Sequence, residues 1–143
     1  MKASNMDSLI GYVLKQWLRS KKQILDEFDL TGSQYEILSA IYSLTYQKKE
    51  IIQIDLSERT MIDPMTTSTI LRNLEKKGFI ERARGTINTR IVIVQLTDKG
   101  KAIYNLASSK IDMISNRLYQ NIDEQNLTSQ LLQLSSELNK LNN

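Results

Sequence analysis

Residues 61–100, MIDPMTTSTILRNLEKKGFIERARGTINTRIVIVQLTDKG, decide the fold of this chain. Asp63 and Pro64 predict a helix start, because Asp caps the free N–H groups of a first turn and proline has no N–H to leave unpaired there. Gly78 predicts the helix end, since glycine readily adopts the left-handed conformation that closes many helices. We therefore expect a helix from Pro64 to about Lys77.

Two short segments after this helix have the composition of paired strands. The first is Ile80–Arg84, and the second, Ile91–Leu96, alternates and is rich in β-branched residues. The residues between them, Gly85–Arg90, would form the hairpin loop. Arg84 and Arg90 flank the loop and should project from one end of the hairpin, although arginines in such loops are often only solvated.

The helix predicted from Pro64 has one apolar and one polar face. A period of 3.6 residues turns inward Thr67, Ile70, Leu71 and Leu74. It turns outward Met65, Thr66, Ser68, Thr69, Arg72, Asn73 and Lys76. Hydroxyls, amides and cations hydrogen-bond base edges and phosphates. Thr and Ser are also weaker helix formers than the Glu, Lys and Gln that usually cover a solvated face. The outward face therefore predicts a nucleic-acid contact.

The charge distribution points the same way. The chain has a net charge of +3, but residues 64–101 hold eight basic and three acidic residues, a net +5 that leaves −2 for the remainder. Clustered positive charge favours nucleic-acid binding, because neutralising phosphates releases counterions. A solvated basic face with no ligand is an equally common explanation of such a cluster.

Composition excludes several function classes. The 143 residues are enough for one folded domain, with 41% hydrophobic and 24% charged residues. There is no cysteine and no histidine, which removes disulfides, thiol and histidine chemistry and the usual zinc sites. Adjacent carboxylates such as Asp26 and Glu27 diverge on a helix and do not form a shared site. We expect no enzyme, no metal and no cofactor.

The N-terminus, MKASNMDSLIGYVLKQW, lacks the unbroken apolar core of a signal peptide. No apolar run is long enough to span a bilayer. We therefore expect a soluble cytoplasmic protein that does not bind membranes.

Helices are predicted on both sides of residues 61–100. Before it we expect helices at about 7–28, 34–46 and 55–61, with Leu56 and Met61 turned inward in the third. Thr31 or Ser33 could cap the second, and Glu36 lies three residues after Ser33, as in a capping box. After it we expect one helix from the Thr97–Gly100 cap to about Asn121, then a last helix.

The terminal helices carry more apolar surface than one short chain can cover. The last helix has leucines spaced four, three, four and three residues apart: Leu127, Leu131, Leu134, Leu138 and Leu141. This spacing is close to a heptad seam and favours helix-on-helix packing, including packing on a second copy of the chain. Burial of the last helix on its own chain is the alternative.

Three helices followed by a basic hairpin describe a winged helix-turn-helix, and here the chain resembles the MarR family of bacterial transcriptional regulators. The resemblance rests on LTGSQYEIL (30–38), DLSERTMIDPMTTSTILRNLEKKGFIER (55–82) and VQLTDKG (94–100). It implies a mainly α fold with a small β-hairpin (α+β), in a single domain over residues 1–143. Residues 30–96 would form the DNA-binding core, and residues 1–29 and 97–143 the dimerisation helices.

The family resemblance also implies a homodimer that binds double-stranded DNA. It places on the recognition face Thr66, Ser68, Thr69, Arg72 and Asn73, and it makes Arg90 the arginine of the wing tip. The wing departs from the family's usual Asp-Arg-Arg, because this chain has Asn88, Thr89 and Arg90 there. Losing the Asp removes an anionic partner that would orient the arginine.

We expect a sequence-specific regulator, in most cases a repressor of pseudo-palindromic operators, with Lys76, Lys77 and Arg84 contacting phosphates. The resemblance further implies release by a small aromatic or phenolic ligand in a crevice that could be lined by Tyr12, Trp17, Tyr35 and Tyr42, although packing is an alternative role for these rings. A winged-helix module that binds proteins and not DNA is the alternative function.

Overall fold

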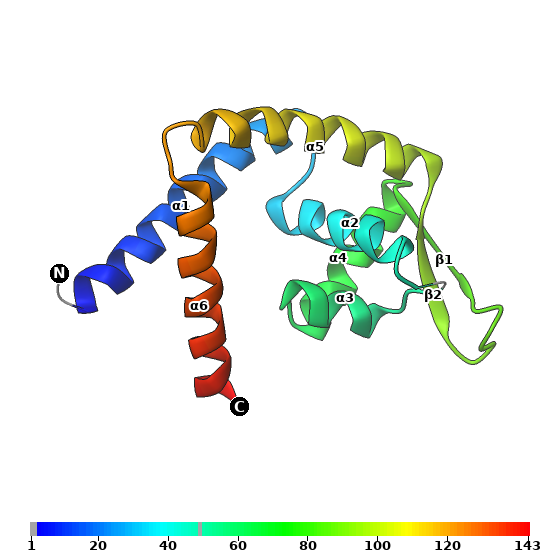
Figure 1. Cartoon of the computed structure of the whole chain (residues 1–143). Coiled ribbons are helices and arrows are strands. Elements are labelled where there is room, and N and C mark those ends of the chain that lie inside the picture. Colours follow the sequence, from blue (N-terminus) through cyan, green and yellow to red (C-terminus); the bar gives the residue numbers. More distant parts are fainter. Residues whose placement is uncertain (1–2, 49) are drawn as a thin grey trace. The chain divides into compact units, whose positions relative to one another are not determined.

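The computed structural model describes residues 3–48 and 50–143 (Figure 1). In these residues the elements are α1 (Ala3–Asp26), α2 (Gly32–Thr45), α3 (Gln53–Thr60), α4 (Pro64–Lys76), β1 (Ile80–Arg84), β2 (Val92–Leu96), α5 (Asp98–Leu118) and α6 (Glu124–Asn142). Six helices and one antiparallel hairpin confirm the predicted mainly helical fold with a small β-hairpin. No helix of the described residues is both long and apolar enough to cross a bilayer.

The chain divides into two compact units, residues 1–108 and 109–143, and the division falls within α5. The second unit holds the rest of α5 and α6. Asp123 begins α6 by accepting a hydrogen bond from the Asn126 N–H at 3.1 Å. No residue of α6 is buried. The predicted α5 helix is a few residues too long, since α5 ends at Leu118.

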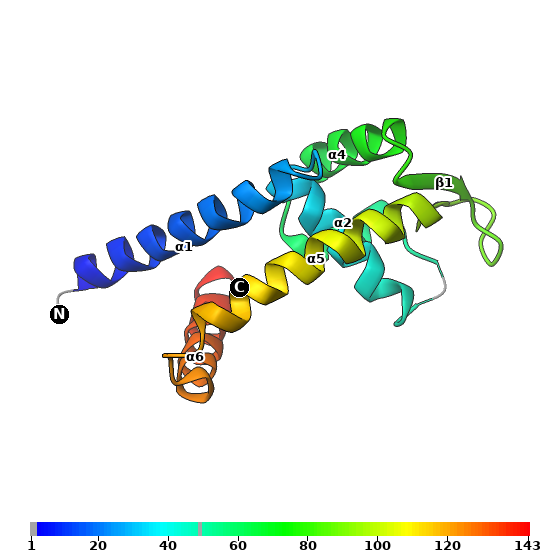
Figure 2. The same ribbon diagram turned by 90° about the horizontal axis from the view of Figure 1, so that it is seen from above.

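The first unit is built around α2, α3 and α4, with the hairpin beside them (Figure 1). Ile37, Leu38 and Ile41 of α2 are fully buried. Only the end of α1 joins this core, through Ile24 and Leu25. In both ribbon views the N-terminal half of α1 projects away from α2–α4 (Figure 2). The core of this unit therefore positions α4 and the hairpin, while much of α1 lies outside it.

The first helix ends earlier than predicted, at Asp26 and not at Phe28. Asp29 adopts a left-handed conformation with φ of 54°, and the Leu30 N–H donates to the Leu25 carbonyl at 3.1 Å. This is a common way to close a helix, and it buries the Leu30 side chain. The break of the helical pattern at residues 29–33 indicates a change of direction there, and the turn begins at Glu27.

The cap of α2 resolves the choice between Thr31 and Ser33. Thr31 Oγ1 accepts the N–H of Gln34 at 3.0 Å, and Gln34 Oε1 accepts the N–H of Thr31 at 3.1 Å. The expected pairing of Ser33 with Glu36 is wrong, because Gln34 completes the capping box as well as a glutamate would.

The end of α3 differs from the prediction at Met61. Leu56 is fully buried, as expected, but the Met61 side chain is 90% exposed. Met61 caps α3 in a left-handed conformation with φ of 61°, which turns its side chain out of the helical pattern. The helix also starts earlier than expected, because the Asp55 carboxylate accepts the Ile52 N–H at 2.9 Å.

The hairpin pairs Ile80 with Leu96, Arg82 with Val94 and Arg84 with Val92. Its second strand begins at Val92, one residue later than predicted, because the Ile91 carbonyl closes the loop by accepting the Gly85 N–H at 3.0 Å. Ile80, Ile93 and Val94 are buried and attach the base of the hairpin to the core.

A tight joint connects α4, β1 and α5. Thr97 Oγ1 donates to the Gly78 carbonyl at 2.6 Å and accepts the Gly100 N–H at 3.0 Å. The Thr97 N–H donates to the Phe79 carbonyl at 3.1 Å. A Cβ on Gly100 would lie 1.9 Å from the Phe79 carbonyl oxygen, so no other residue fits this approach. The first turn of α5 is therefore packed directly on the end of α4 and the start of β1.

Candidate nucleic-acid interface

The inner face of α4 fixes its orientation. Thr67, Ile70, Leu71 and Leu74 are all buried, which confirms the predicted inward face. Thr67 Oγ1 donates to the Ile62 carbonyl at 3.2 Å and accepts from Ser57 Oγ at 3.3 Å. These bonds satisfy a hydroxyl that burial would otherwise leave unpaired, and they attach α4 to α3. The opposite face of α4 is thus held outward.

Both ends of α4 follow the sequence prediction. The Asp63 carboxylate accepts the Thr66 N–H at 3.4 Å and the Thr66 hydroxyl at 3.1 Å. Pro64 occupies the first turn, where its missing N–H costs nothing. At the other end Gly78 has φ of 79°, the left-handed conformation that glycine adopts without strain. The helix is therefore defined by local sequence at both ends.

The outer face of α4 is polar and exposed. Five of the six predicted α4 contact residues lie on it with exposed side chains: Thr66, Thr69, Arg72, Asn73 and Lys76. Ser68, the sixth, is half-buried. Thr69 Oγ1 donates to the Met65 carbonyl at 3.2 Å and accepts from Arg72 Nη2 at 3.2 Å. Arg72 is thus held against the helix by an exposed bond that a ligand could replace.

Arginines gather on the hairpin. Arg82, Arg84 and Arg90 line a hollow of about 270 Å³ at its loop end. Arg84 Nη1 donates to the Thr89 carbonyl at 3.2 Å, which crosses the loop. The Arg90 backbone N–H donates to Asn88 Oδ1 at 3.0 Å. Asn88 therefore orders the backbone at Arg90, in place of the side-chain pairing that an Asp would offer.

Arg82 is a member of this cluster that the sequence analysis did not select. Its alternation with Arg84 along β1 places both on one face of the strand and could have identified it. Arg82 Nη2 donates to Glu75 at 2.9 Å, and this hydrogen bond holds the pKa of the Glu75 carboxyl below its usual value. Part of the Arg82 charge is therefore already balanced by α4.

A second contact that sequence reasoning missed comes from Glu50, in the linker between α2 and α3. Glu50 Oε1 accepts the N–H of Thr86 at 2.6 Å and the N–H of Ile87 at 2.7 Å. These bonds, that of Ile87 foremost, lower the pKa of the Glu50 carboxyl. No local pattern could reveal the contact, because 36 residues separate Glu50 from Thr86.

Lys77, expected to contact a phosphate, has polar partners within the chain. Its ammonium donates to the Asp29 carbonyl and to Gln34 Oε1, the latter at 3.2 Å. It also lies 3.6 Å from the Asp29 carboxylate. Lys77 therefore joins the end of α4 to the turn before α2.

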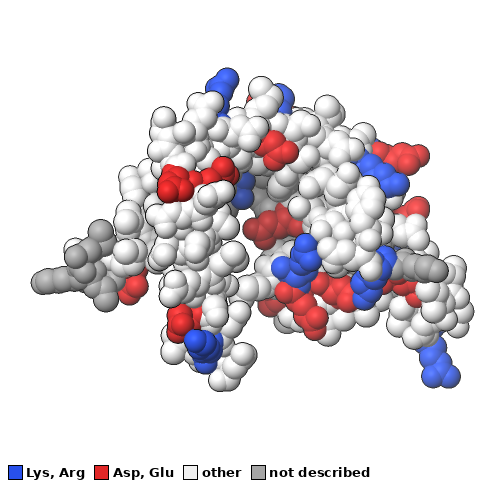
Figure 3. Space-filling model, in the orientation of Figure 1, with Lys and Arg blue, Asp and Glu red and all other residues white. Residues whose placement is uncertain are grey.

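The visible face in Figure 3 carries Lys and Arg interspersed with Asp and Glu, and a cation protrudes where the hairpin ends. Charge on this face is therefore mixed. The basic excess of residues 64–101 is local to α4, the hairpin and the start of α5.

Two of the four aromatic candidates share a ring partner. Tyr35 stacks on Tyr104 with ring centroids 5.6 Å apart, and Tyr42 contacts the same ring at 4.8 Å. Tyr12 is 60% exposed on α1, and Trp17 lies under the Lys21 ammonium. Tyr35 and Tyr42 thus share one aromatic cluster with Tyr104.

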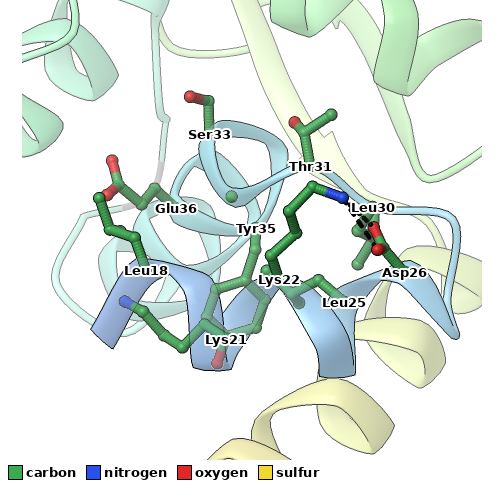
Figure 4. A pocket seen from close by; sticks show the side chains of 11 residues that line it. Leu18, Lys21, Lys22, Leu25, Asp26, Leu30, Thr31, Ser33, Tyr35 and Glu36 are labelled. Carbon is green, nitrogen blue, oxygen red and sulfur yellow. Dashed lines mark hydrogen bonds and ion pairs between the residues drawn. The ribbon is translucent and has the colours of Figure 1, made fainter. Parts of the chain in front are cut away.

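Of these four residues, Tyr35 alone lines the hollow of about 420 Å³ between α1 and α2. Figure 4 shows its lining, which comes from the C-terminal half of α1, the following turn and the start of α2. Two cations, Lys21 and Lys22, and two carboxylates, Asp26 and Glu36, add charge to walls that are otherwise mainly apolar.

Comparison with known proteins agrees with this geometry. The model of the family described as transcriptional regulator SarA/Rot matches residues 19–107. The chain belongs to the SarA/Rot family of transcriptional regulators. SarZ of Staphylococcus saprophyticus, an HTH-type transcriptional regulator, is 33% identical over 110 residues, which cover 77% of this chain and 73% of SarZ. The alignment with the first curated relative covers 63% of that protein.

Solved structures agree on the fold. The MepR–DNA complex of Staphylococcus aureus matches with a TM-score of 0.78 and 26% identity over 98% of this chain and 96% of that chain. A MarR family transcriptional regulator from Rhodococcus has the same fold at 18% identity, with a TM-score of 0.76 over 95% of this chain and 94% of that chain. The MarR-type winged helix-turn-helix expected from the sequence is confirmed, and the family to which this chain belongs is one of transcriptional regulators.

Proposed function

We propose that this SarA/Rot family member is a cytoplasmic, dimeric, sequence-specific DNA-binding regulator that represses pseudo-palindromic operators. The observation that carries the proposal is the outer face of α4. Its opposite face is buried, both of its ends are capped, and its exposed side chains are the polar groups that read bases. The arginine-lined hollow of the hairpin lies in the same unit. The MepR–DNA complex, a structural neighbour, supports DNA as the ligand.

On DNA, α4 would enter the major groove. Asn73 can bond the adenine edge bidentately, Arg72 the guanine edge, and the Thr69 methyl can contact a thymine methyl. Thr66 and Ser68 complete this reading face. Reading guanine requires Arg72 to exchange its bond with Thr69 for one with the base.

Phosphates would be contacted by Lys76 and by Arg84 of the hairpin. Arg90 would reach the minor groove from the wing tip. These contacts fix register and carry the salt dependence of binding, while α4 supplies base preference.

Dimerisation would use the helices outside residues 30–96, namely residues 1–29 and 97–143. The apolar residues of α1 are exposed, with Val13 at 53% and Leu14 at 54%. The leucine seam of α6 is exposed as well, from Leu127 at 38% to Leu141 at 80%. Contiguous apolar surface of this kind marks a protein interface. A two-fold axis would then present two α4 helices to half-sites about one helical turn apart.

Ligand control would use the hollow between α1 and α2. Its mainly apolar lining holds the Tyr35 ring, and the Lys21 ammonium could pair with a small aromatic anion, whereas the Lys22 ammonium is already paired with the Asp26 carboxylate at 2.9 Å. The other three aromatic candidates would contact such a ligand only if the helices rearranged, because the hollow is not lined by Tyr12, Trp17 or Tyr42. A thermal-shift series with aromatic acids tests ligand control. An unchanged melting temperature across the series would exclude a ligand of this class.

Selection of bound duplexes from a random pool, followed by gel-shift titration at two salt concentrations, tests the proposal. Asn73→Ala and Thr69→Ala should each cost about 1–3 kcal/mol at particular base positions. Arg90→Ala should weaken binding on most sequences and reduce the salt slope by about 1.

Lys140→Ala is the matched control, because Lys140 is an exposed cation near the end of α6. It should leave binding unchanged. Salt-insensitive or undetectable duplex binding by the purified wild-type protein would overturn the proposed function and favour a protein-binding module.

A further inference from the structure

The wing loop, residues 85–91, has its internal hydrogen bonds at its base and in its second half. Its side chains are exposed except at the ends, where Gly85 is buried and Ile91 half-buried. The Gly85 N–H donates to the Ile91 carbonyl and the Arg90 N–H donates to Asn88 Oδ1, each at 3.0 Å. The Ile91 N–H donates to the Asn88 carbonyl at 3.4 Å, and Arg84 Nη1 donates to the Thr89 carbonyl at 3.2 Å. All four bonds lie at the base or in the second half of the loop. Its first half, Thr86 and Ile87, is fixed from elsewhere.

That outside support is Glu50. A single oxygen, Oε1, accepts both the Thr86 and the Ile87 N–H, and it lies 3.2 Å from the Thr86 hydroxyl. The other oxygen, Oε2, lies over Gly85, where an added Cβ would be only 3.1 Å away. Hydrogen bonds from backbone N–H groups to a carboxylate are stronger than those between neutral groups. The loop is thus wrapped closely around this carboxylate.

The next residue makes a second contact with the same hairpin. The Ile51 carbonyl accepts the Val94 N–H at 2.8 Å, and the Ile51 side chain is 4% exposed. Residues 50 and 51 therefore hold the hairpin at two levels, one in the middle of β2 and one in the loop.

The linker is in turn fixed to α3. Asp55 Oδ2 accepts the Ile52 N–H at 2.9 Å, and Asp55 Oδ1 accepts from the Lys48 ammonium at 3.0 Å. A continuous series of bonds thus runs from the first turn of α3, through residues 50–52, to the first half of the wing loop.

We propose that Glu50 is a positioning residue for the wing: its carboxylate orders the Thr86–Ile87 turn and ties the loop that carries Arg90 to α3. The DNA part of this inference rests on the proposed function, whereas the ordering of the loop does not. Asn88 occupies the place where the wing of the resembled family carries an Asp. The loop of this chain is ordered by a carboxylate from a different segment.

Glu50→Ala and Glu50→Gln separate positioning from charge. Gln keeps a carbonyl oxygen that can take the place of Oε1 for both N–H groups, whereas Ala removes the acceptor. In the full-length protein without DNA, amide hydrogen exchange at Thr86 and Ile87 should accelerate by about tenfold in Glu50→Ala and by much less in Glu50→Gln. Glu58→Ala, at an exposed glutamate of α3, is the matched control and should leave both rates unchanged.

The Leu71 amide of the core reports whether each variant is folded. Equal exchange at Thr86 and Ile87 in wild type and a folded Glu50→Ala variant overturns the proposal. A rise that is as large in Glu50→Gln as in Glu50→Ala also overturns the assignment to the shared oxygen.

DNA binding provides the second readout. Glu50→Ala should weaken duplex binding by about tenfold in the wild-type background, but have little further effect when combined with Arg90→Ala, because both changes act through one loop. Tighter binding by Glu50→Ala would mean that the carboxylate only repels phosphates, and an equal loss in both backgrounds would mean that it acts elsewhere. Either result overturns the positioning role. If the wild-type protein binds no DNA, the proposed function fails while the exchange measurement still tests the loop.

Discussion

Two parts of the same module, α4 and the wing loop, are held in place by different forces. α4 is positioned by four buried side chains and by caps at both ends. The wing loop is exposed, and its first half depends on hydrogen bonds to one carboxylate. Burial resists changes in pH and salt, whereas exposed hydrogen bonds and charges respond to both. We expect α4 to keep its geometry under conditions that release the loop.

The largest effect should follow from removing the burial that supports α4. Leu71→Ala deletes a fully buried side chain and should lower the free energy of unfolding by about 2–5 kcal/mol. Urea denaturation followed by circular dichroism measures it. Met65→Ala, at a side chain that is 83% exposed on the same helix, should change stability by less than about 0.5 kcal/mol.

Protein concentration must be equal in the two titrations, because dimer formation would make the midpoint depend on it. Equal losses in Leu71→Ala and Met65→Ala would contradict the view that burial on one face of α4 holds it.

A smaller effect is expected at the start of α4. Asp63→Ala removes the acceptor for the Thr66 N–H and should cost about 0.5–2 kcal/mol. Asp63→Asn keeps a side-chain oxygen at the same position and should recover most of this loss. The same denaturation assay decides, and an Asp63→Asn variant as unstable as Asp63→Ala would argue against capping.

The smallest effect on global stability should come from the loop, and it should depend on pH. The folded-state pKa of Glu50 lies below its ordinary value of 4.5, because the Ile87 and Thr86 N–H groups favour the carboxylate. Because the pKa of Glu50 is lower in the folded than in the unfolded protein, its carboxylate stabilises the folded loop fully at a pH above the unfolded-state pKa. This stabilisation is lost as the pH falls through the folded-state pKa. Amide exchange at Thr86 and Ile87, corrected for its intrinsic pH dependence, should stay slow at neutral pH and lose its protection below pH 4.5.

The Leu71 amide should remain protected over the range in which the loop is released. Loss of protection at both places together would mean that the loop and α4 are one cooperative unit, and would remove the contrast between them.

Local rules were sufficient for α4 and insufficient for its surroundings. Asp63, Pro64 and Gly78 act on their own backbone, so the sequence predicts both ends of the helix. Thr31 and Ser33 both satisfy the rules for a cap, and each is followed three residues later by Gln or Glu, so local rules do not choose between them. Helical periodicity predicts that the Met61 side chain turns inward. This prediction assumes a helical backbone and fails where the residue adopts the left-handed conformation, as Met61 does.

The contacts of Glu50 and Lys77 could not be predicted, for a different reason. Glu50 meets the N–H groups of Thr86 and Ile87, and Lys77 meets the Asp29 carbonyl 48 residues away. Such contacts depend on tertiary structure and leave no pattern in neighbouring residues. The α4 residues proposed to contact DNA could be selected from the sequence because they share one face of one helix, and Arg84 and Arg90 because they flank the predicted hairpin loop.

The absence of a side chain at Gly100 has a mechanical consequence. The Phe79 carbonyl oxygen lies against the position that a Cβ of residue 100 would take. Thr97 also donates hydrogen bonds to the Gly78 and Phe79 carbonyls, so the joint between α4, β1 and α5 is tightly packed. The first turn of α5 is therefore held directly against the end of α4 and the start of β1. A tilt of the first turn of α5 would thus act directly on the end of α4 and on the start of β1.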